Sequence, residues 1–363
     1  MTTFLIFIGV LSVLVLVHEF GHFWFAKKSG MKVEEFGFGF PPRLFAYKKG
    51  ETEYSINLIP FGGFVKIFGE DGNERDNGHA FTAKSFWWKM AVVLAGVGMN
   101  MLLAVVLLWI VNVVGIRAVI NDPAEIATDN LRDVKVQVAR VAPGSPIEQA
   151  GVRPLDELIA VSVAEGARET ISSPAILHGF VESHIGQPLK LEVRRGDETI
   201  VYDLTPRQNP PEGEGRLGVQ MAHTGVASFP IHTAFTRALL YTYSITIQTL
   251  QGYGSIVYGL LTTAKLSADV SGPVGIAVIT RQASDIGFAY LLQFMAAISI
   301  NLAVLNSLPL PALDGGRALL LVFERLRGRP LSKRIEGYIH TGGFALLLAF
   351  MIYVTVKDVI KFF

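Results

Sequence analysis

The stretch "VLVHEFGHFWFA", Val15–Ala26, places two histidines and a glutamate inside a run of apolar residues long enough for a membrane helix. Each of these ionisable side chains is costly to bury in lipid, so their presence calls for a functional reason. His18 and His22 are four residues apart and would share one face of a helix, with Glu19 projecting beside them. The segment therefore predicts a membrane-spanning helix with a polar cluster.

The spacing of this cluster is the H-E-x-x-H pattern, in which two imidazoles hold Zn²⁺ and the adjacent carboxylate takes a proton from water. Its chance expectation in a chain of this composition is roughly 0.01. An alternative places the histidines at the membrane interface, at a helix end, but apolar residues continue to Phe25 and Ala26. The pattern therefore indicates a zinc site with Glu19 as the catalytic base.

The composition of the whole chain is that of a membrane protein. Half of the 363 residues are hydrophobic, 17% are charged, and the mean hydropathy is positive. The net charge of +1 provides no basic surface for nucleic acid, so no nucleic-acid partner is expected. Because cysteine is absent, any metal site has to be built from nitrogen and oxygen ligands.

Four segments are long and apolar enough to cross a bilayer, which takes about 20 helical residues. They are Phe4–Ala26, the stretch between Lys89 and Arg117, Ile286 toward Leu313, and the stretch between Glu336 and Lys357. Pro309 and Pro311 should end the third helix near Ser307, because proline removes a hydrogen-bond donor. Gly96 and Gly98 in the second segment would permit close helix packing.

The basic residues favour one orientation of these segments. The loop Lys27–Lys89 and the loop after the third segment are rich in lysine and arginine, which places both in the cytoplasm. The N-terminus, the region Ile116–Asp285 and the C-terminus then lie outside. A fifth uncharged stretch, Ala238–Ala264, is dense in polar residues, and as a span it would move the arginine-rich loop outside. We therefore expect it to lie at the interface.

A catalytic zinc site needs a third protein ligand, and Asp314 is the best candidate. It lies in "NSLPLPALDGG", Asn306–Gly316, at the cytoplasmic end of the third segment, where it can reach the depth of His18 and His22. The alternative is that Asp314 caps the helix predicted by "GGRALLLVFERL" behind it. The residue by itself does not decide whether Asp314 is a zinc ligand or a helix cap.

Outside the membrane, the region 128–222 has the pattern of a small α+β domain. The stretches "VKVQVARVAPGSPIEQAGVRPLDELIAVS" and "PLKLEVRRGDETIVYDLTP" alternate strands with glycine and proline turns, and a short helix is predicted near Ile147–Ala150. The stretch "VAPGSPIEQAGV" resembles bacterial PDZ domains, and "RPLDELIAVS" replaces the glycine-aspartate step common in them. The resemblance implies one PDZ-like domain.

The cytoplasmic loop contains "YSINLIPFGGFVKI", in which Tyr54, Ile56 and Leu58 alternate with polar residues before a Pro-Phe-Gly-Gly turn. This pattern predicts a β-hairpin. A transmembrane substrate must unwind before cleavage, because helical peptide bonds are hydrogen-bonded and shielded. An exposed strand edge beside the site could pair with the unwound segment. Tyr54–Leu58 and Phe64–Ile67 are the candidate edges.

Together these stretches resemble the site-2 proteases, the intramembrane zinc metalloproteases, and specifically their bacterial regulator-of-sigma-E-protease branch. The resemblance covers nearly the full chain. It rests on "HEFGH" at 18–22, "GFGFPP" at 37–42, "NLIPFGGFVK" at 57–66, "SGPVGI" at 271–276 and "NSLPLPALDGG" at 306–316. It implies that His18, His22 and Asp314 bind one Zn²⁺ and that Glu19 is the general base.

The resemblance also implies a substrate site beside the metal. Its expected residues are Asn306, Pro309, Pro311, Tyr54, Ile56 and Leu58. Asn301 is a further candidate, for which hydrogen bonding between helices is the alternative. The PDZ-like domain would screen substrates by size or recognise trimmed ends.

We therefore expect a polytopic α-helical membrane protein with four transmembrane helices, a membrane-associated β-hairpin or sheet, and one extracytoplasmic PDZ-like α+β domain. Residues 1–127 would form the N-terminal membrane part with the H-E-x-x-H helix, and 128–222 the PDZ-like domain. Residues 223–285 would form an interfacial amphipathic segment, and 286–363 the C-terminal membrane part with the "LDGG" motif.

The expected function is zinc-dependent proteolysis of single-span membrane substrates, either anti-sigma factors or signal-peptide remnants. The expected location is the bacterial cytoplasmic (inner) membrane, with the active site toward the cytoplasm. One alternative is a non-enzymatic membrane scaffold that presents a PDZ domain, against which the intact ligands and base argue. Another is a metal transporter, which would need acidic residues in more of the spans. The residues leave the substrates and the oligomeric state open.

Overall fold

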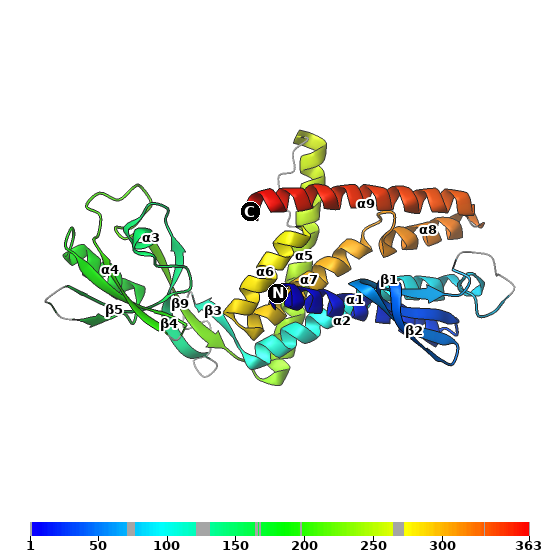
Figure 1. Cartoon of the computed structure of the whole chain (residues 1–363), viewed down its shortest axis with the longest axis horizontal. Coiled ribbons are helices and arrows are strands. Elements are labelled where there is room, and N and C mark those ends of the chain that lie inside the picture. The colour runs from blue at the N-terminus through cyan, green and yellow to red at the C-terminus, as the bar shows by residue number, and fades with distance from the viewer. Residues whose placement is uncertain are drawn as a thin grey trace. The chain divides into compact units, whose positions relative to one another are not determined.

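The computed structural model describes residues 2–70, 77–120, 131–163, 166, 168–196, 198–263, 272–329 and 331–362. The chain forms two compact units, Met1–Val111 with Ile231–Phe363, and Asn112–Pro230 (Figure 1). The first unit is mainly helical with a small sheet, and the second is built on a larger sheet. Ser271 of "SGPVGI" and residues 128–130 of the expected PDZ-like domain lie outside the described residues.

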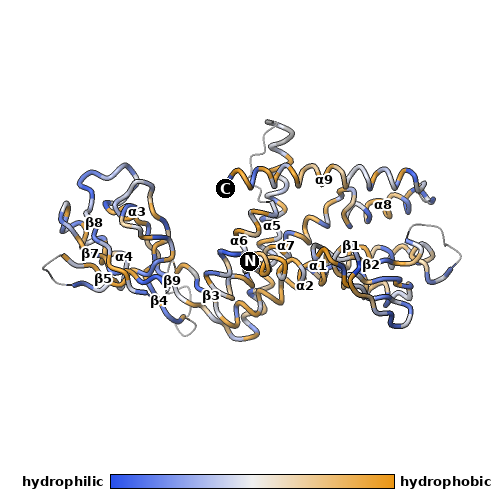
Figure 2. Tube along the Cα trace, in the orientation of Figure 1, coloured by the Kyte–Doolittle hydropathy of each residue, from blue (hydrophilic) through white to orange (hydrophobic). Residues whose placement is uncertain are grey.

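Four helices within the described ranges are long and apolar enough to cross a membrane, which confirms the expected number of candidate spans. They are α1 (Thr2–Lys28), α2 (Phe86–Val114), α7 (Phe288–Ser307) and α9 (Lys333–Phe362). Figure 2 shows hydrophobic residues along much of each helix. The helix α7 ends at Ser307, as expected from the prolines that follow it.

The first unit also contains α5 (Ile231–Thr263), α6 (Pro273–Ile286) and α8 (Asp314–Arg327). The helix α5 is not among the candidate spans, and its axis crosses the direction of α1 and α7 (Figure 1). The Tyr253 hydroxyl of α5 donates a hydrogen bond to Asn301 Oδ1 of α7. This bond favours the packing role for Asn301, and the interfacial placement of α5 stays a prediction.

The helices of the first unit meet in an apolar core. Leu14 of α1, Ala104 of α2, Ala238 of α5 and Ile300 of α7 are fully buried in it. The alanines allow the helix backbones to approach closely, as is usual where helices pack in lipid. This packing fixes α1 against its neighbours, and with it the depth of the two histidines.

The strands β1 (Val33–Lys49) and β2 (Thr52–Ile67) form the small sheet of the first unit, and each contributes two segments to it. Residues 52–57 pair with 43–49 on one side, and residues 53–56 pair with 35–38 on the other. Residues 63–67 pair with 33–38. Within the described residues, 53–56 are therefore central, and the segments 43–49 and 63–67 are the two edges.

This pairing corrects one expectation from the sequence. Tyr54 and Ile56 have backbone partners on both sides, so Tyr54–Leu58 is not a free edge. The alternation predicted a strand correctly, but its buried face is the polar one. Ser55 and Asn57 are 3% and 4% exposed, whereas Ile56 and Leu58 are 50% and 55% exposed. Asn57 Nδ2 donates to carbonyl oxygens of β1, which satisfies the buried amide.

The second unit is a sheet with the strand order β3-β9-β4-β5-β7-β8, in which β6 also pairs with β5. The strands are β3 (Ile116–Ile120), β4 (Leu131–Val141), β5 (Glu157–Val163), β6 (Glu169–Thr170), β7 (Leu189–Arg195), β8 (Glu198–Leu204) and β9 (Val219–Ala227). The helices α3 (Pro146–Ala150) and α4 (Pro174–Ser183) bury Ile147 and Leu177 against Leu158 and Leu191 of the sheet. A short helix was expected where α3 lies.

The limits of this unit differ from the expected ones. The strand β3 pairs with β9, so residues 116–120 belong to the sheet and not to the N-terminal membrane part. The strand β9 runs to Ala227, so residues 223–227 are not part of the segment expected at the interface, whose helix begins at Ile231. The sequence pattern missed both limits because β3 is short and its partner strand is distant in the sequence.

A partly buried ion pair lies where the PDZ-like pattern departs from the glycine-aspartate step. Asp156 is 2% exposed, and its carboxylate accepts hydrogen bonds from Arg195 Nε and Nη2 at 2.8 and 2.7 Å. It also accepts a bond of 2.8 Å from the backbone N–H of Arg153. Hydrogen bonding to this carboxylate raises the pKa of Arg195 above its ordinary value. The pair ties the end of β7 to the turn before β5.

Candidate metal centre

His18 and His22 lie one turn apart on α1, and their rings meet edge to face with centroids 4.8 Å apart. Their two Nε2 atoms are 3.2 Å apart. Both side chains are largely buried, with 11% and 13% of their surface exposed. The helix therefore presents two imidazole nitrogens to one point.

Asp314 joins this pair from the far end of the sequence. Its Oδ2 lies 3.1 Å from His18 Nε2 and 3.4 Å from His22 Nε2. Asp314 is the first residue of α8, whose N-cap is Leu313, and the described residues show no side-chain capping bond there. The alternative interpretation, in which Asp314 caps the helix, therefore does not match this geometry.

Two glycines allow the turn that carries Asp314. A Cβ on Gly315 would overlap the carbonyl oxygen of Ser307, and one on Gly316 would overlap that of Leu310. Only glycine therefore lets the start of α8 fold back over the end of α7. The "GG" of "LDGG" thus brings the aspartate to the histidines.

The three donor atoms fit a zinc ion. Their pair separations are 3.1, 3.2 and 3.4 Å. Tetrahedral zinc with bonds of about 2.0–2.1 Å requires ligand atoms roughly 3.3–3.4 Å apart. In addition, Asp314 Oδ2 is buried with no hydrogen-bond partner in the described part of the chain, which is costly unless a cation lies beside it. Two imidazoles and one carboxylate leave a fourth position for water, as catalytic zinc sites require.

Two groups on α2 orient the imidazoles. His22 Nδ1 lies 2.8 Å from the Val92 carbonyl oxygen, so Nδ1–H donates to it and Nε2 keeps its lone pair. His18 Nδ1 lies 3.3 Å from the side-chain amide nitrogen of Asn100. Asn100 Oδ1 is buried without a partner among the residues described, and turning the amide over would let it accept Nδ1–H. Both histidines would then offer Nε2 to a metal.

Gly96 lets α2 approach the histidines. A Cβ at this position would lie 2.5 Å from His22 Nε2 and 2.7 Å from His18 Nε2. Gly98 has no described atom within 4 Å of a Cβ built on it. Of the two glycines that were expected to permit close packing, only Gly96 does so, and it packs against the site itself.

Glu19 and the strand edge 63–67 share one cavity with the metal cluster. The cavity has a volume of about 220 Å³ and is lined by His18, Glu19, His22 and Asp314 together with Gly63, Phe64, Val65 and Ile67 of β2. A Cβ on Gly63 would lie 3.2 Å from Glu19 Cγ. The edge therefore passes directly beside the expected general base.

The remaining residues expected at the substrate site are not among the described residues that line this cavity. Asn306 lies in the last turn of α7, and Pro309 and Pro311 lie in the turn that leads to α8. Tyr54, Ile56 and Leu58 lie in the first half of β2. The structure thus brings together the residues of the metal cluster and the edge 63–67, but not this second set.

Several neighbours of the site escaped the sequence analysis. Arg317 and Glu70 line the cavity and form an ion pair, and the guanidinium carbon of Arg317 lies 4.8 Å from the Phe81 ring centre. The Val92 carbonyl has no sequence signature, because every residue has a backbone carbonyl. Asn100 did have a sequence signature, because a side-chain amide inside an apolar span needs a hydrogen-bond partner.

Because two imidazoles and a carboxylate converge within an apolar helical unit, the class of protein that this fold and site define is a membrane metallopeptidase. The model of "Peptidase family M50" matches residues 6–350 of the chain. The chain therefore belongs to peptidase family M50, the site-2 protease family.

Its relatives match it along almost the full length. A Clostridium perfringens protein, provisionally named a zinc metalloprotease, is 34% identical over 349 residues, which is 96% of each chain. The zinc metalloprotease RasP of Shouchella clausii is 30% identical over 100% of each chain. The regulator of sigma-E protease RseP of Salmonella typhimurium is 29% identical over 95% of each chain.

Proposed function

We propose that this chain cleaves peptide bonds in or near transmembrane segments, with one Zn²⁺ held by His18, His22 and Asp314 and with Glu19 as general base. The observation that carries the proposal is the convergence of three donor atoms 3.1 to 3.4 Å apart, two from α1 and one from α8. The relatives named zinc metalloproteases support the choice of metal. A non-enzymatic scaffold would have no need of this convergence.

The side chains of the site have distinct parts in hydrolysis. When bound, zinc supplies Lewis acidity that activates water and polarises a carbonyl oxygen. Glu19 lines the cavity beside the ligands, so its carboxylate can take a proton from the attacking water and return it to the leaving amine. The Val92 carbonyl holds His22 in the required tautomer.

The cavity limits the shape of the substrate. Its volume is about 220 Å³. An α-helix with side chains is about 10 Å across and does not fit such a space, whereas an extended segment does. The substrate therefore has to unwind before it reaches Glu19, which exposes its backbone N–H and C=O groups. In lipid these groups need new partners.

The edge 63–67 of β2 is the proposed partner for the unwound segment. It lines the cavity, and no strand pairs with its outer side within the described residues. Pairing along it would replace the hydrogen bonds that the substrate loses. The part of Asn306, Pro309 and Pro311 in substrate binding, and that of the side chains of Tyr54, Ile56 and Leu58, stays a prediction.

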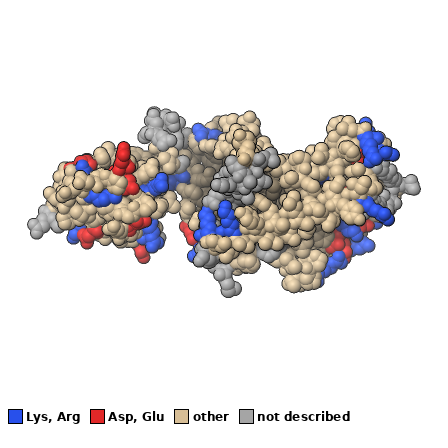
Figure 3. Space-filling model, turned by 90° about the horizontal axis from the view of Figure 1, so that it is seen from above, with Lys and Arg blue, Asp and Glu red and all other residues tan. Residues whose placement is uncertain are grey.

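The proposed substrates are single-span membrane proteins, either anti-sigma factors or signal-peptide remnants. The name of the Salmonella relative, regulator of sigma-E protease, supports the first class. Figure 3 shows lysine and arginine gathered at the end of the first unit that holds β1, β2 and the end of α8. This charge supports a cytoplasmic position for that end, in a bacterial cytoplasmic membrane. The N-terminus, the second unit and the C-terminus would lie outside.

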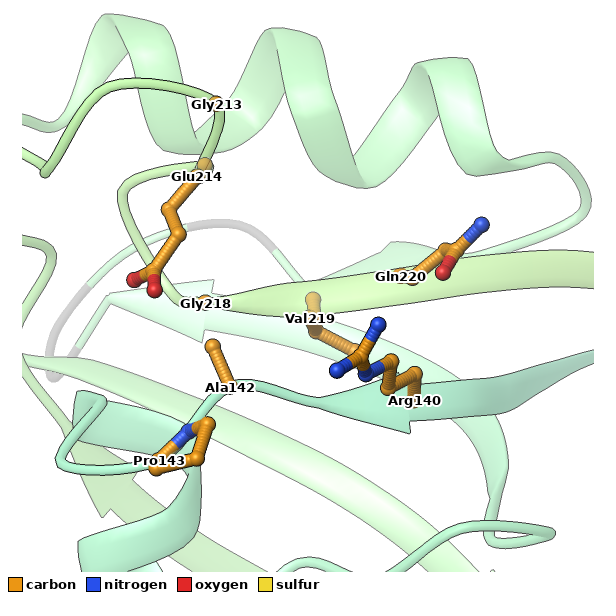
Figure 4. Close-up of a pocket in the computed structure, with 9 residues that line it drawn as sticks. Arg140, Ala142, Pro143, Gly213, Glu214, Gly218, Val219 and Gln220 are labelled. Carbon is orange, nitrogen blue, oxygen red and sulfur yellow. The ribbon is translucent and has the colours of Figure 1, made fainter. Parts of the chain in front are cut away.

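The second unit is the proposed PDZ-like part, which would screen substrates by size or recognise trimmed ends. It contains a pocket of about 520 Å³ (Figure 4). Arg140 and Ala142 line it from β4 and its end, Val219 and Gln220 from β9, and Gly213 and Glu214 from a loop. Arg140 offers a positive charge there, and the other charged residue of the lining, Glu214, is paired with Arg207. A trimmed peptide end with a free carboxylate is the ligand that this pocket would suit.

The proposed reaction is tested with purified wild-type protein, Glu19→Gln and Asp314→Ala in liposomes. We expect about one zinc per chain in wild type and in Glu19→Gln, and cleavage of a model transmembrane peptide only in wild type. Asp314→Ala should lose both zinc and cleavage. Undiminished cleavage by Glu19→Gln would show that Glu19 is not the general base. A wild-type protein that is active without zinc would refute the metal site.

The substrate edge is tested by a pair of proline variants, because proline removes one backbone donor. Val65→Pro lies on the edge 63–67, and Ala46→Pro lies on the opposite edge of the same sheet. Both variants should keep their zinc, and only Val65→Pro should lose most of the cleavage. Equal activity of two zinc-loaded variants would show that substrates do not pair with this edge.

A further inference from the structure

A basic pocket lies between the start of α2 and the end of α8. It has a volume of about 420 Å³. Among the described residues that line it, four are basic and one is acidic, namely Lys84, Lys89, Arg325, Arg329 and Glu324. The proposed reaction and the substrate edge use none of these side chains. The pocket is therefore a feature that proteolysis alone does not explain.

The positive charge of this pocket is held in place by its surroundings. Lys89 Nζ lies 5.8 Å from the Phe81 ring centre, and the Arg325 guanidinium lies 5.9 Å from that of Phe86. Glu324 Oε1 accepts a hydrogen bond of 2.8 Å from the backbone N–H of Leu331. Even without Lys89, three cations among the described lining residues stand against one carboxylate, and this excess attracts an anion.

Two further features of the pocket suit a phosphate group. Ser85 lines it and directly precedes Phe86, the first residue of the 29-residue helix α2, and the start of a helix favours anions. Thr82 also lines the pocket, and its hydroxyl oxygen is buried with no hydrogen-bond partner among the residues described. A buried hydroxyl without a partner is costly, and rotation of the Thr82 side chain toward the pocket would let it donate to a phosphate oxygen.

Exposed apolar side chains lie on the same helix ends that carry the cations. Trp87, in the first turn of α2, is 76% exposed, and Leu326, next to Arg325 on α8, is 82% exposed. Exposed tryptophan at the end of a membrane helix is typical of the lipid–water interface. Cations and exposed apolar side chains at the same helix ends match a ligand that has both an anionic head and acyl chains.

We propose that this pocket binds the phosphate headgroup of an anionic phospholipid, with the lipid chains against Trp87 and Leu326. Basic pockets between helices on the cytoplasmic side of a membrane are suited to such headgroups. The bound lipid would bridge α2, which carries Val92 and Asn100, to α8, which begins at Asp314. The site would thus join the two helices that support the metal centre.

The proposal is tested by native mass spectrometry of the full chain, released from mixed micelles of phosphatidylglycerol and phosphatidylcholine. Two variants change the pocket, Lys84→Gln/Arg329→Gln and the uncharged replacement Thr82→Val. The matched control Lys48→Gln/Lys49→Gln removes the same charge from the exposed end of β1. Thermal unfolding of each variant shows whether the fold is intact.

We expect wild type and control to retain one phosphatidylglycerol that phosphatidylcholine does not replace. Retention should fall about tenfold or more in Lys84→Gln/Arg329→Gln and roughly threefold or more in Thr82→Val. Equal losses in the control and the pocket variants would show general charge attraction and overturn the site. Unchanged retention in the pocket variants would also overturn it.

A second arm distinguishes the lipid from a soluble phosphate. Glycerol-1-phosphate carries the same anionic group without acyl chains, and it should compete with phosphatidylglycerol at least a hundred times less well, because it gains nothing from the apolar side chains. Competition at equal concentrations would make the pocket a site for soluble phosphates and would refute the lipid assignment. Neither arm uses proteolysis as its readout, so the result is independent of the proposed reaction.

Discussion

Gly96→Ala is the substitution whose effect follows most directly from the geometry of the metal centre. The added methyl carbon would lie 2.5 Å from His22 Nε2, whereas ordinary contact begins at 3.4 Å, so the atoms have to separate by about 0.9 Å. Metal–ligand distances tolerate deviations of only about 0.2 Å. The methyl group also occupies the side from which both imidazoles offer Nε2. We expect zinc affinity to fall by about 100-fold or more.

The assay is zinc competition with a chromogenic chelator, carried out on purified Gly96→Ala, on wild type and on the matched variant Gly98→Ala. Gly98 has no described atom within 4 Å of a Cβ, so alanine there should leave zinc affinity unchanged. In both variants alanine should favour the helix by up to about 1 kcal/mol relative to glycine. If a folded Gly96→Ala protein binds zinc with wild-type affinity, α2 does not pack against the two imidazoles as described.

Three further predictions concern groups that support the site and the fold. Asn100→Leu should weaken zinc binding about 10- to 100-fold without unfolding the protein, measured by the same competition, and unchanged affinity would rule out its support of the imidazole. Asp156→Ala should destabilise the second unit by about 1–2 kcal/mol, because the Arg153 backbone N–H and the Arg195 guanidinium lose their acceptor, although Arg195 can still reach water. Hydrogen exchange of β5 and β7 measures this, and unaltered protection would contradict it. Asp358 of α9 accepts a 2.7 Å hydrogen bond from the Gly275 backbone N–H, so Asp358→Ala should cost about 1 kcal/mol and speed exchange in the first turn of α6.

Features that depend on local sequence were predictable. Four apolar runs predicted four candidate spans, and Pro309 predicted the end of α7 at Ser307, because a proline acts on its own neighbourhood. His18 and His22 were found from the H-E-x-x-H pattern, and their spacing of four residues predicted that they share one helix face. For Asp314, the sequence identified the residue as a candidate and predicted its depth in the membrane. The choice between a zinc ligand and a helix cap needed the geometry of α8.

Features that depend on distant pairing were not predictable. The segment around Tyr54 is central in its sheet because β1 folds along both of its sides, and no local pattern shows which segment becomes the edge. Ser55 and Asn57 face inward, and the apolar side chains that alternate with them face outward. In a sheet with one face in water, the apolar side chains would instead face inward. The Val92 carbonyl reaches His22 only because α2 packs closely against α1.

In the proposed site His18, His22 and Asp314 hold one zinc ion, although the aspartate lies about 290 residues beyond the histidines. Zinc-edge X-ray absorption of the Glu19→Gln protein tests it most directly, since this variant should keep its metal without turnover. We expect one zinc per chain with two imidazole ligands and one carboxylate ligand, and loss of that spectrum in Asp314→Ala. A zinc-free protein, or an unchanged spectrum in Asp314→Ala, would contradict it.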